Sequence, residues 1–155
     1  MSTGTNDERA PITILMADDD PDDRMLAFEA LEECRISNSL HAVEDGEELM
    51  DYLKRRGKYS DPASSPRPGL ILLDLNMPRK SGREALREIK TDVDLCRIPV
   101  VVLTTSQSEE DVVRSYDEGA NSFISKPVTF DGLVDVMRGL QHYWFEIVAV
   151  PRDGR

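Results

Sequence analysis

The sequence contains few of the residues on which common catalytic and metal sites are built. Its two cysteines, Cys34 and Cys96, are far apart and form no CxxC pair, and His41 and His142 are isolated. This excludes a zinc site and a disulfide framework, and it predicts free thiols in a reducing compartment. No run reaches the ~18 apolar residues of a membrane helix, and residues 1–11 lack the apolar core of a signal peptide. We therefore expect a soluble, cytoplasmic protein without membrane association.

Positive charge is also scarce. The chain of 155 residues has 19 Lys and Arg against 30 Asp and Glu, which gives a formal net charge of −11. Such a field repels nucleic acid and excludes it as a partner. The hydrophobic content of 39% is that of a globular protein, and the length fits one domain. We expect a disordered tail over 1–10, one domain over 11–150 and a tail over 151–155.

Five short apolar runs alternate with segments of helical pattern. The runs span residues 12–16, 39–43, 70–73, 99–103 and 122–125. The expected helices span about 20–35, 46–53, 81–92, 106–118 and 129–150. Leu-Ile-Leu-Leu at 70–73 is apolar at every position, as in a strand buried on both faces. The alternation predicts an α/β fold with a five-stranded parallel sheet and helices on both faces.

Polar residues follow directly after four of these strands. Asp18 and Asp19 follow the first, Asp74 follows the third, Thr104 follows the fourth and Lys126 follows the fifth. Because the carboxyl ends of parallel strands share one edge of the sheet, where open α/β sheets bind their ligands, we expect these side chains to converge.

The other acids of the segment 18–23 have a structural explanation. Asp20 suits a helix N-cap and Pro21 the first helical position. Asp22 and Asp23 favour the positive end of the helix dipole. Asp18 is left without such a role, as is its neighbour Asp19.

The expected cluster has the composition of a metal and phosphoryl site. Three carboxylates in one pocket repel each other, and a hard divalent cation such as Mg²⁺ or Mn²⁺ relieves the repulsion. Lys126 adds a positive charge, and the Thr104 hydroxyl can donate to a phosphoryl oxygen. Asp74, facing both the ion and the lysine, suits a nucleophile that forms an aspartyl phosphate. The alternative is a buried ion-pair network without chemistry.

Taken in order, the motifs resemble the receiver domain of bacterial two-component response regulators. They are Ala17-Asp18-Asp19, Leu72-Leu73-Asp74-Leu75-Asn76-Met77-Pro78, Thr104-Thr105 and Lys126-Pro127, within a resemblance from about Ile12 to Val150. The resemblance implies a flavodoxin-like sheet with strand order 2-1-3-4-5. It also implies that a sensor histidine kinase phosphorylates Asp74 and that the protein is a switch rather than an enzyme.

The resemblance assigns the metal ligands. Asp19, Asp74 and the main-chain carbonyl of Asn76 would hold Mg²⁺, with Mn²⁺ as the alternative ion and Asp18 acting largely through water. Lys126 would pair with the phosphoryl group.

The resemblance also implies a switch. Thr104 would move towards the phosphoryl group and Phe123 would turn inward, which repacks the surface of the fourth helix, fifth strand and fifth helix. Phe123 is equally well explained as a core aromatic. Asn76 and Ser106 would position the water that hydrolyses the phosphate, and the Lys126–Pro127 peptide bond would be cis.

The last helical segment is apolar over more of its circumference than packing on one sheet requires. We predict a homodimer face formed by Val136, Tyr143, Trp144 and Ile147; the alternative is that this face folds back onto the domain. The ending and the long loop 57–69, for which the sequence indicates no role, resemble the stand-alone response regulators of bacterial phytochromes. A bacteriophytochrome kinase is therefore the expected donor.

An enzyme is the competing interpretation. A Mg²⁺-dependent phosphatase or phosphotransferase of the dehalogenase type also forms an aspartyl phosphate, but it needs Asp-x-Asp after its first strand. Here Asp18 and Asp19 are adjacent, and Asp74-Leu75-Asn76 lacks the second carboxylate. Steady turnover of phosphate esters would favour this alternative.

Overall fold

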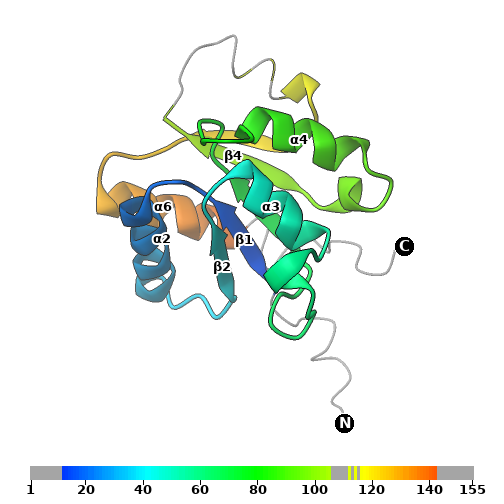
Figure 1. The fold of residues 1–155 in the computed structure, drawn as a ribbon. Coiled ribbons are helices and arrows are strands. Elements are labelled where there is room, and N and C mark those ends of the chain that lie inside the picture. Colours follow the sequence, from blue (N-terminus) through cyan, green and yellow to red (C-terminus); the bar gives the residue numbers. More distant parts are fainter. Residues whose placement is uncertain (1–11, 106–111, 113, 115, 143–155) are drawn as a thin grey trace.

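The computed structural model of the chain describes residues 12–105, 112, 114 and 116–142. A parallel sheet with the order β2-β1-β3-β4-β5 forms its centre (Figure 1). The strands are β1 Ile14–Ala17, β2 Leu40–Val43, β3 Leu70–Leu73, β4 Val100–Thr104 and β5 Ser122–Ser125. The predicted α/β class and the flavodoxin-like strand order are both confirmed.

Helices cover both faces of the sheet, with α2 beside α6 and α3 beside α4 (Figure 1). They span α2 Pro21–Glu33, α3 Gly46–Leu53, α4 Gly82–Thr91 and α6 Phe130–Leu140, with short 3₁₀ turns η1 Gly57–Tyr59 and η2 Leu95–Arg97. The part of the last helix predicted from 143 to 150 lies outside the described residues, as does most of the helix predicted over 106–118.

Side-chain caps start the helices where the sequence predicted them. The Asp20 side chain accepts a hydrogen bond from the Asp22 amide at 2.9 Å. Ser81 and Glu84 form the full capping box, and Thr129 caps α6. Such caps contribute about 1 kcal/mol each because they satisfy amides that have no partner within the helix.

Alternation along the strands divides the core into two layers. Leu15 and Ile71 point to the face covered by α3 and α4, where they pack with Leu49 and Leu86. The neighbouring strand positions point to the other face and pack against α2 and α6. Since β1, β3 and β4 are buried on both faces, their side chains are apolar throughout until each strand ends.

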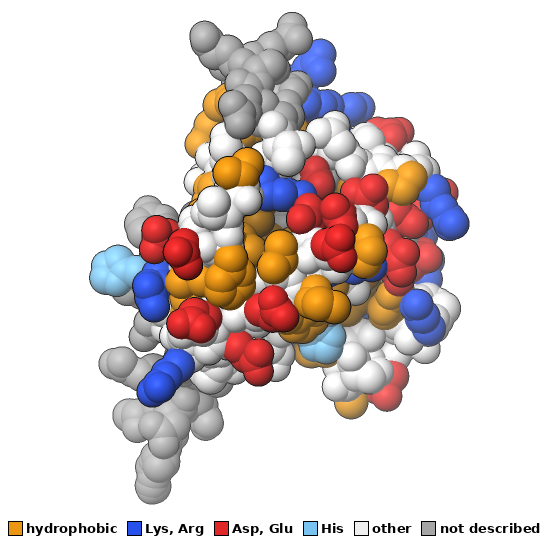
Figure 2. Space-filling view, turned by 90° about the vertical axis from the view of Figure 1, so that its left-hand side faces the viewer, with side chains coloured by type: hydrophobic (Ala, Val, Ile, Leu, Met, Phe, Trp, Pro, Cys, Tyr) orange, Lys and Arg blue, Asp and Glu red, His pale blue; other side chains and the backbone are white. Residues whose placement is uncertain are grey.

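The exposed side of α2 differs from a simple amphipathic helix. Its buried positions include the small residues Ala27 and Ala30, which allow close packing, while Met25 and Phe28 are 61% and 45% exposed. Figure 2 shows hydrophobic side chains among acidic ones on this side of the molecule. This face therefore presents an apolar surface to solvent that the sequence pattern did not predict.

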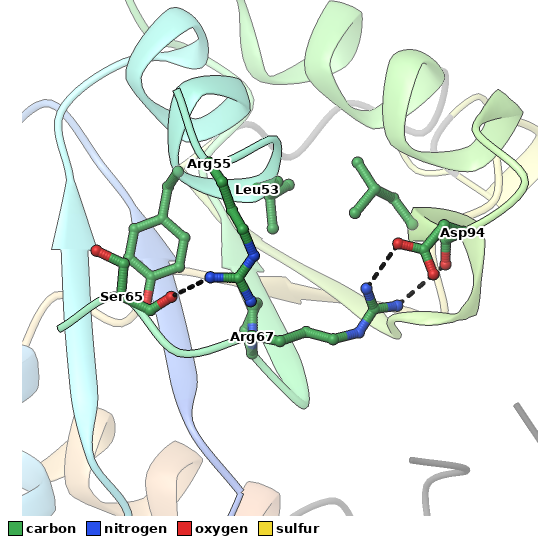
Figure 3. A pocket seen from close by; sticks show the side chains of 8 residues that line it. Leu53, Arg55, Ser65, Arg67 and Asp94 are labelled. Carbon is green, nitrogen blue, oxygen red and sulfur yellow. Dashed lines mark hydrogen bonds and ion pairs between the residues drawn. The ribbon is translucent and has the colours of Figure 1, made fainter. Parts of the chain in front are cut away.

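The loop between α3 and β3 is anchored to the domain. The Tyr52 hydroxyl donates to the Pro66 carbonyl at 2.8 Å, and the Tyr59 hydroxyl donates to Glu48. The loop lines a pocket of about 60 Å³ at the amino-terminal edge of the sheet, where Arg55 donates to the Ser65 carbonyl (Figure 3). This edge is opposite to the strand ends that carry Asp18, Asp74 and Lys126.

Within the described part of the chain, no helix is both long enough and apolar enough to span a membrane.

Candidate functional site

Four strand ends form one edge of the sheet and each delivers a polar residue to it. The register aligns the ends of β1 and β3, so Asp18 and Asp74, which follow them, are neighbours. Thr104 is the last residue of β4, and Lys126 follows β5 beside it. Main-chain hydrogen bonds fix this edge: the Asp74 amide donates to the Ala17 carbonyl at 3.0 Å, and the Lys126 amide donates to the Thr104 carbonyl at 2.8 Å.

The Lys126 ammonium lies at the centre of the site. Its nitrogen is 2.7 Å from a carboxylate oxygen of Asp18, 2.9 Å from one of Asp23 and 3.1 Å from one of Asp74. The lysine side chain is 11% exposed. An ammonium group has three donors, so each of them has a carboxylate partner here.

Asp74 is held by hydrogen bonds on both of its oxygens. Oδ1 accepts from the Thr104 hydroxyl at 2.9 Å and from the main-chain amide of Asn76 at 3.0 Å. Oδ2 accepts from Lys126. Asp74 is 6% exposed and Thr104 is fully buried. The carboxylate is therefore fixed in orientation, as a nucleophile must be.

Burial and charge act against each other at this edge. Burial raises the pKa of Asp18 above its usual value, although the Lys126 hydrogen bond and the Asp20 amide act to lower it. Burial alone would lower the pKa of Lys126, but the hydrogen bonds to Asp18 and Asp23 and the charge of Asp74 outweigh it, so the pKa is raised. Lys126 therefore stays charged, and a single cation faces several acids.

The acids at this edge fit a divalent metal ion. Oxygens of Asp18, Asp19 and Asp74 all lie within 4.8 Å of one another, which is close enough for one ion to contact all three. Their all-oxygen composition suits a hard cation such as Mg²⁺ or Mn²⁺. Asp19 is exposed, so an ion can reach the group from solvent. The main-chain carbonyl of Asn76 remains a predicted ligand.

A glycine supports the position of Asp74. At Gly82, the first residue of α4, a Cβ atom would lie 2.0 Å from the Asp74 carbonyl oxygen and 2.7 Å from the Cα of Leu75. The Gly82 amide donates to the Leu75 carbonyl at 3.0 Å. Only glycine permits this close approach, which joins the start of α4 to the turn that carries Asp74.

The remaining predicted residues are more distant from the site or lie outside the described residues. Phe123 is half-buried and packs against the core layer under α3 and α4, and its movement in the switch stays a prediction. Val136 is half-buried against the core layer under α2 and α6. Of the residues predicted to position the hydrolytic water, Asn76 is described and exposed beside Asp74, whereas Ser106 lies outside the described residues. Three residues of the predicted dimer face also lie outside them: Tyr143, Trp144 and Ile147.

Sequence reasoning assigned Asp23 only to the helix dipole, but the structure brings it into the site. Asp22 and Asp23 both lie in the first turn of α2, which starts at the same sheet edge as the strand-end acids. The rotation of about 100° per helical residue turns only Asp23 towards Lys126. The sequence carries no signal that separates the two, because the helical repeat alone does not show which face of α2 turns towards the sheet edge.

The prediction of a cis peptide bond before Pro127 is wrong, because the described residues contain no cis peptide bond. The trans form is favoured by roughly 0.5–1 kcal/mol before proline. With this trans bond, Lys126 already reaches all three of its carboxylate partners.

Comparison with known proteins places these features in a family. The family model of the response regulator receiver domain matches residues 14–138. The response regulator Rcp1 of Synechocystis sp. is 42% identical over 147 residues, which cover 95% of this chain and 98% of Rcp1.

Solved structures agree with this relationship. The Mn²⁺-bound form of Rcp1 has a TM-score of 0.82 at 43% identity, with 92% of this chain and 100% of that chain covered. The phosphorylated cyanobacterial phytochrome response regulator RcpA has a TM-score of 0.79 at 43% identity, with 87% and 94% covered. The chain therefore belongs to the response regulator receiver domains, which act in two-component signalling and are phosphorylated on an aspartate.

Proposed function

We propose that Asp74 is the aspartate that accepts the phosphoryl group, from a phosphohistidine of a sensor histidine kinase. The observation that carries this assignment is the set of donors on its carboxylate: Lys126 at 3.1 Å on Oδ2 and Thr104 at 2.9 Å on Oδ1. In the reaction an Asp74 oxygen attacks phosphorus, the P–O bond forms, the P–N bond to the donor imidazole breaks, and the imidazole leaves with the bonding electron pair.

The residues around Asp74 have complementary tasks in this proposal. Asp18, Asp19, Asp74 and the Asn76 carbonyl would hold Mg²⁺, or Mn²⁺ in its place; the Mn²⁺-bound form of Rcp1 supports a divalent ion. The bound ion would supply positive charge against the phosphoryl oxygens. Lys126 neutralises further charge, and the Thr104 hydroxyl turns from Asp74 to a phosphoryl oxygen.

The same arrangement supports a switch. Phosphorylation adds about −1.5 to −2 charges and three acceptor oxygens next to Thr104. Movement of Thr104 then frees space for Phe123, and β5 and the helices beside it repack. Asn76 and Ser106 orient the water that ends the signal.

The partners follow from the relatives and from the surface. RcpA is by its name a phytochrome response regulator, which supports a phytochrome-type kinase as the donor. The exposed Met25 and Phe28 lie on α2, which begins at the sheet edge that carries Asp74, and they would offer the kinase an apolar docking surface. The aspartyl-phosphate phosphatase alternative is not favoured, because the family relationship is to signalling switches.

The proposed homodimer uses Val136 together with Tyr143, Trp144 and Ile147. Light scattering with and without the phosphoryl mimic beryllofluoride tests it. We expect the mass of two chains in at least one state; the mass of a single chain in both states would remove the dimer from the proposal.

Intact-mass measurement after incubation with acetyl phosphate and Mg²⁺ tests the phosphorylation itself. We expect one added phosphoryl group, which does not form when the ion is chelated and is absent from Asp74→Asn. Unchanged phosphorylation of Asp74→Asn would disprove the assignment. Continuous release of inorganic phosphate from phosphate esters would favour the phosphatase.

A further inference from the structure

We infer that Asp23 is a positioning residue of this site, which holds the Lys126 ammonium while the divalent ion and the phosphoryl group occupy Asp18 and Asp74. The inference rests on the proposed function and adds a residue to it. Asp23 is recruited from the first turn of α2 rather than from a strand end.

The three carboxylates around Lys126 belong to two classes. Asp18 and Asp74 are members of the acid group whose oxygens lie within 4.8 Å of one another, and they are lysine partners at the same time. Asp23 bonds Lys126 at 2.9 Å but is not a member of that group. Asp23 is therefore the one acceptor of the three that the ion does not need.

Lysine and the ion compete for the same oxygens. Asp18 uses Oδ1 to accept the Asp20 amide and Oδ2 to accept Lys126. The oxygens of Asp74 are likewise engaged by Thr104 and Lys126. Two cations on one carboxylate repel each other, so a bound ion would displace the ammonium from one or both of these residues.

Asp23 resolves this competition. The Lys126 ammonium keeps its bond to Asp23 when it releases an oxygen to the ion, so it stays beside Asp74 with a proton free for a phosphoryl oxygen. The Asp23 side chain is 30% exposed, against 1% for Asp18, so an ion pair between Asp23 and Lys126 requires less desolvation of the carboxylate. The Arg24 guanidinium, which donates to the Asp18 carbonyl at 2.7 Å, fixes the turn that orients Asp23.

Asp22 supplies a matched control. It lies in the same helical turn, is exposed and carries the same charge, and among the described residues it forms no ion pair. Asp22→Asn and Asp23→Asn therefore change the net charge and the helix-dipole interaction equally. Only Asp23→Asn removes a partner of Lys126.

The experiment is a titration of the full chain with Mn²⁺, followed by electron paramagnetic resonance of the free ion. We expect Asp23→Asn to raise the dissociation constant on the order of tenfold, as for other directly coupled pairs, and Asp22→Asn to raise it by no more than about twofold. Asp23→Glu, which keeps the charge, restores most of the affinity. In a Lys126→Met background, Asp23→Asn should raise the dissociation constant for Mn²⁺ no more than Asp22→Asn does, because no ammonium remains to be held.

The outcomes separate the inference from the proposed function. Equal dissociation constants for Asp22→Asn and Asp23→Asn overturn the inference alone. A tenfold rise of the dissociation constant on Asp23→Asn in the Lys126→Met background also overturns the inference, since Asp23 would then act on the ion directly. A wild-type chain that binds no Mn²⁺ overturns the proposed function and the inference with it.

Discussion

Replacement of Lys126 by methionine tests the electrostatic account of the site in its metal-free state. Methionine keeps the apolar stem of the side chain but removes the ammonium group. Asp18, Asp23 and Asp74 then lose their shared positive partner. We expect the variant to be less stable than the wild type in the presence of a chelator.

The burial of the three acids sets the size of the effect. The side chains of Asp18 and Asp74 are 1% and 8% exposed, while that of Asp23 is 30% exposed. Removal of one partner from a buried ion pair costs roughly 3–5 kcal/mol, because a buried charge is left uncompensated. Since Asp23 can turn to water, we expect the lower end, about 3 kcal/mol out of the roughly 5–15 kcal/mol that stabilise a domain.

Urea unfolding followed by circular dichroism measures this cost, first in EDTA and then with saturating Mg²⁺. We expect the deficit of Lys126→Met to shrink with Mg²⁺, because the ion would neutralise Asp18 and Asp74, two of the three acids that lose the ammonium. Lys58→Met is the control. The Lys58 ammonium lies 3.3 Å from Glu48, but its side chain is 75% exposed, and the expected change is within about 1 kcal/mol.

The pH dependence follows from the raised pKa of Lys126. The stability that its charge contributes is fully present below the unfolded-state pKa of about 10.4 and is lost as the pH rises through the higher pKa of the folded state. The deficit of the variant should therefore persist across neutral pH. A Lys126→Met variant as stable as the wild type in EDTA at pH 7 would refute the electrostatic account.

Other substitutions probe individual contacts. Burial raises the pKa of Asp18, so the stability that this carboxyl contributes is present below about pH 3.9 and is lost as the pH rises through its folded-state pKa. Asp18→Asn should then stabilise the metal-free protein at pH 7 on the order of 1 kcal/mol by thermal unfolding in EDTA; lower stability would contradict this. Gly82→Ala should destabilise by about 1–3 kcal/mol in urea, since the new Cβ overlaps the Asp74 carbonyl. Gly139→Ala, where a Cβ meets nothing within 4 Å, should stabilise by roughly 0.5–1 kcal/mol, and equal effects at both glycines would show the close approach to be unimportant. Thr104→Val should cost about 1 kcal/mol and slow phosphorylation by acetyl phosphate, measured by intact mass, because Asp74 loses a hydroxyl donor; an unchanged rate would exclude that role.

The sequence predicts the fold well because periodicity and caps carry strong local signals. The apolar run 70–73 and its counterparts at 14–17 and 100–103 are buried on both faces, so composition alone identifies them as strands of a parallel sheet. The capping box at Ser81 and Glu84 marks the start of α4 to the residue. Parallel topology then brings the strand ends together without further information.

The sequence is less informative where the direction of a side chain decides whether it reaches the site or the core. Asp22 and Asp23 are identical in type and neighbours in sequence, and only the rotation of α2 on the sheet separates a solvent-exposed acid from a partner of Lys126. On α2 the pattern likewise does not show that Ala27 is buried while Phe28 is exposed, because packing against α6 favours the small side chain. Which of two neighbouring residues on a helix faces the protein depends on tertiary contacts and not on local helix propensity.

Chemical trapping of the phosphorylated residue tests the central claim most directly. After reaction with acetyl phosphate and Mg²⁺, borohydride reduces an aspartyl phosphate to homoserine, and peptide mass spectrometry locates the converted residue. We predict homoserine at position 74 and at no other aspartate. Conversion at Asp18, Asp19 or Asp23, or no conversion in a chain that has gained a phosphoryl group, would contradict the assignment of Asp74 as the acceptor.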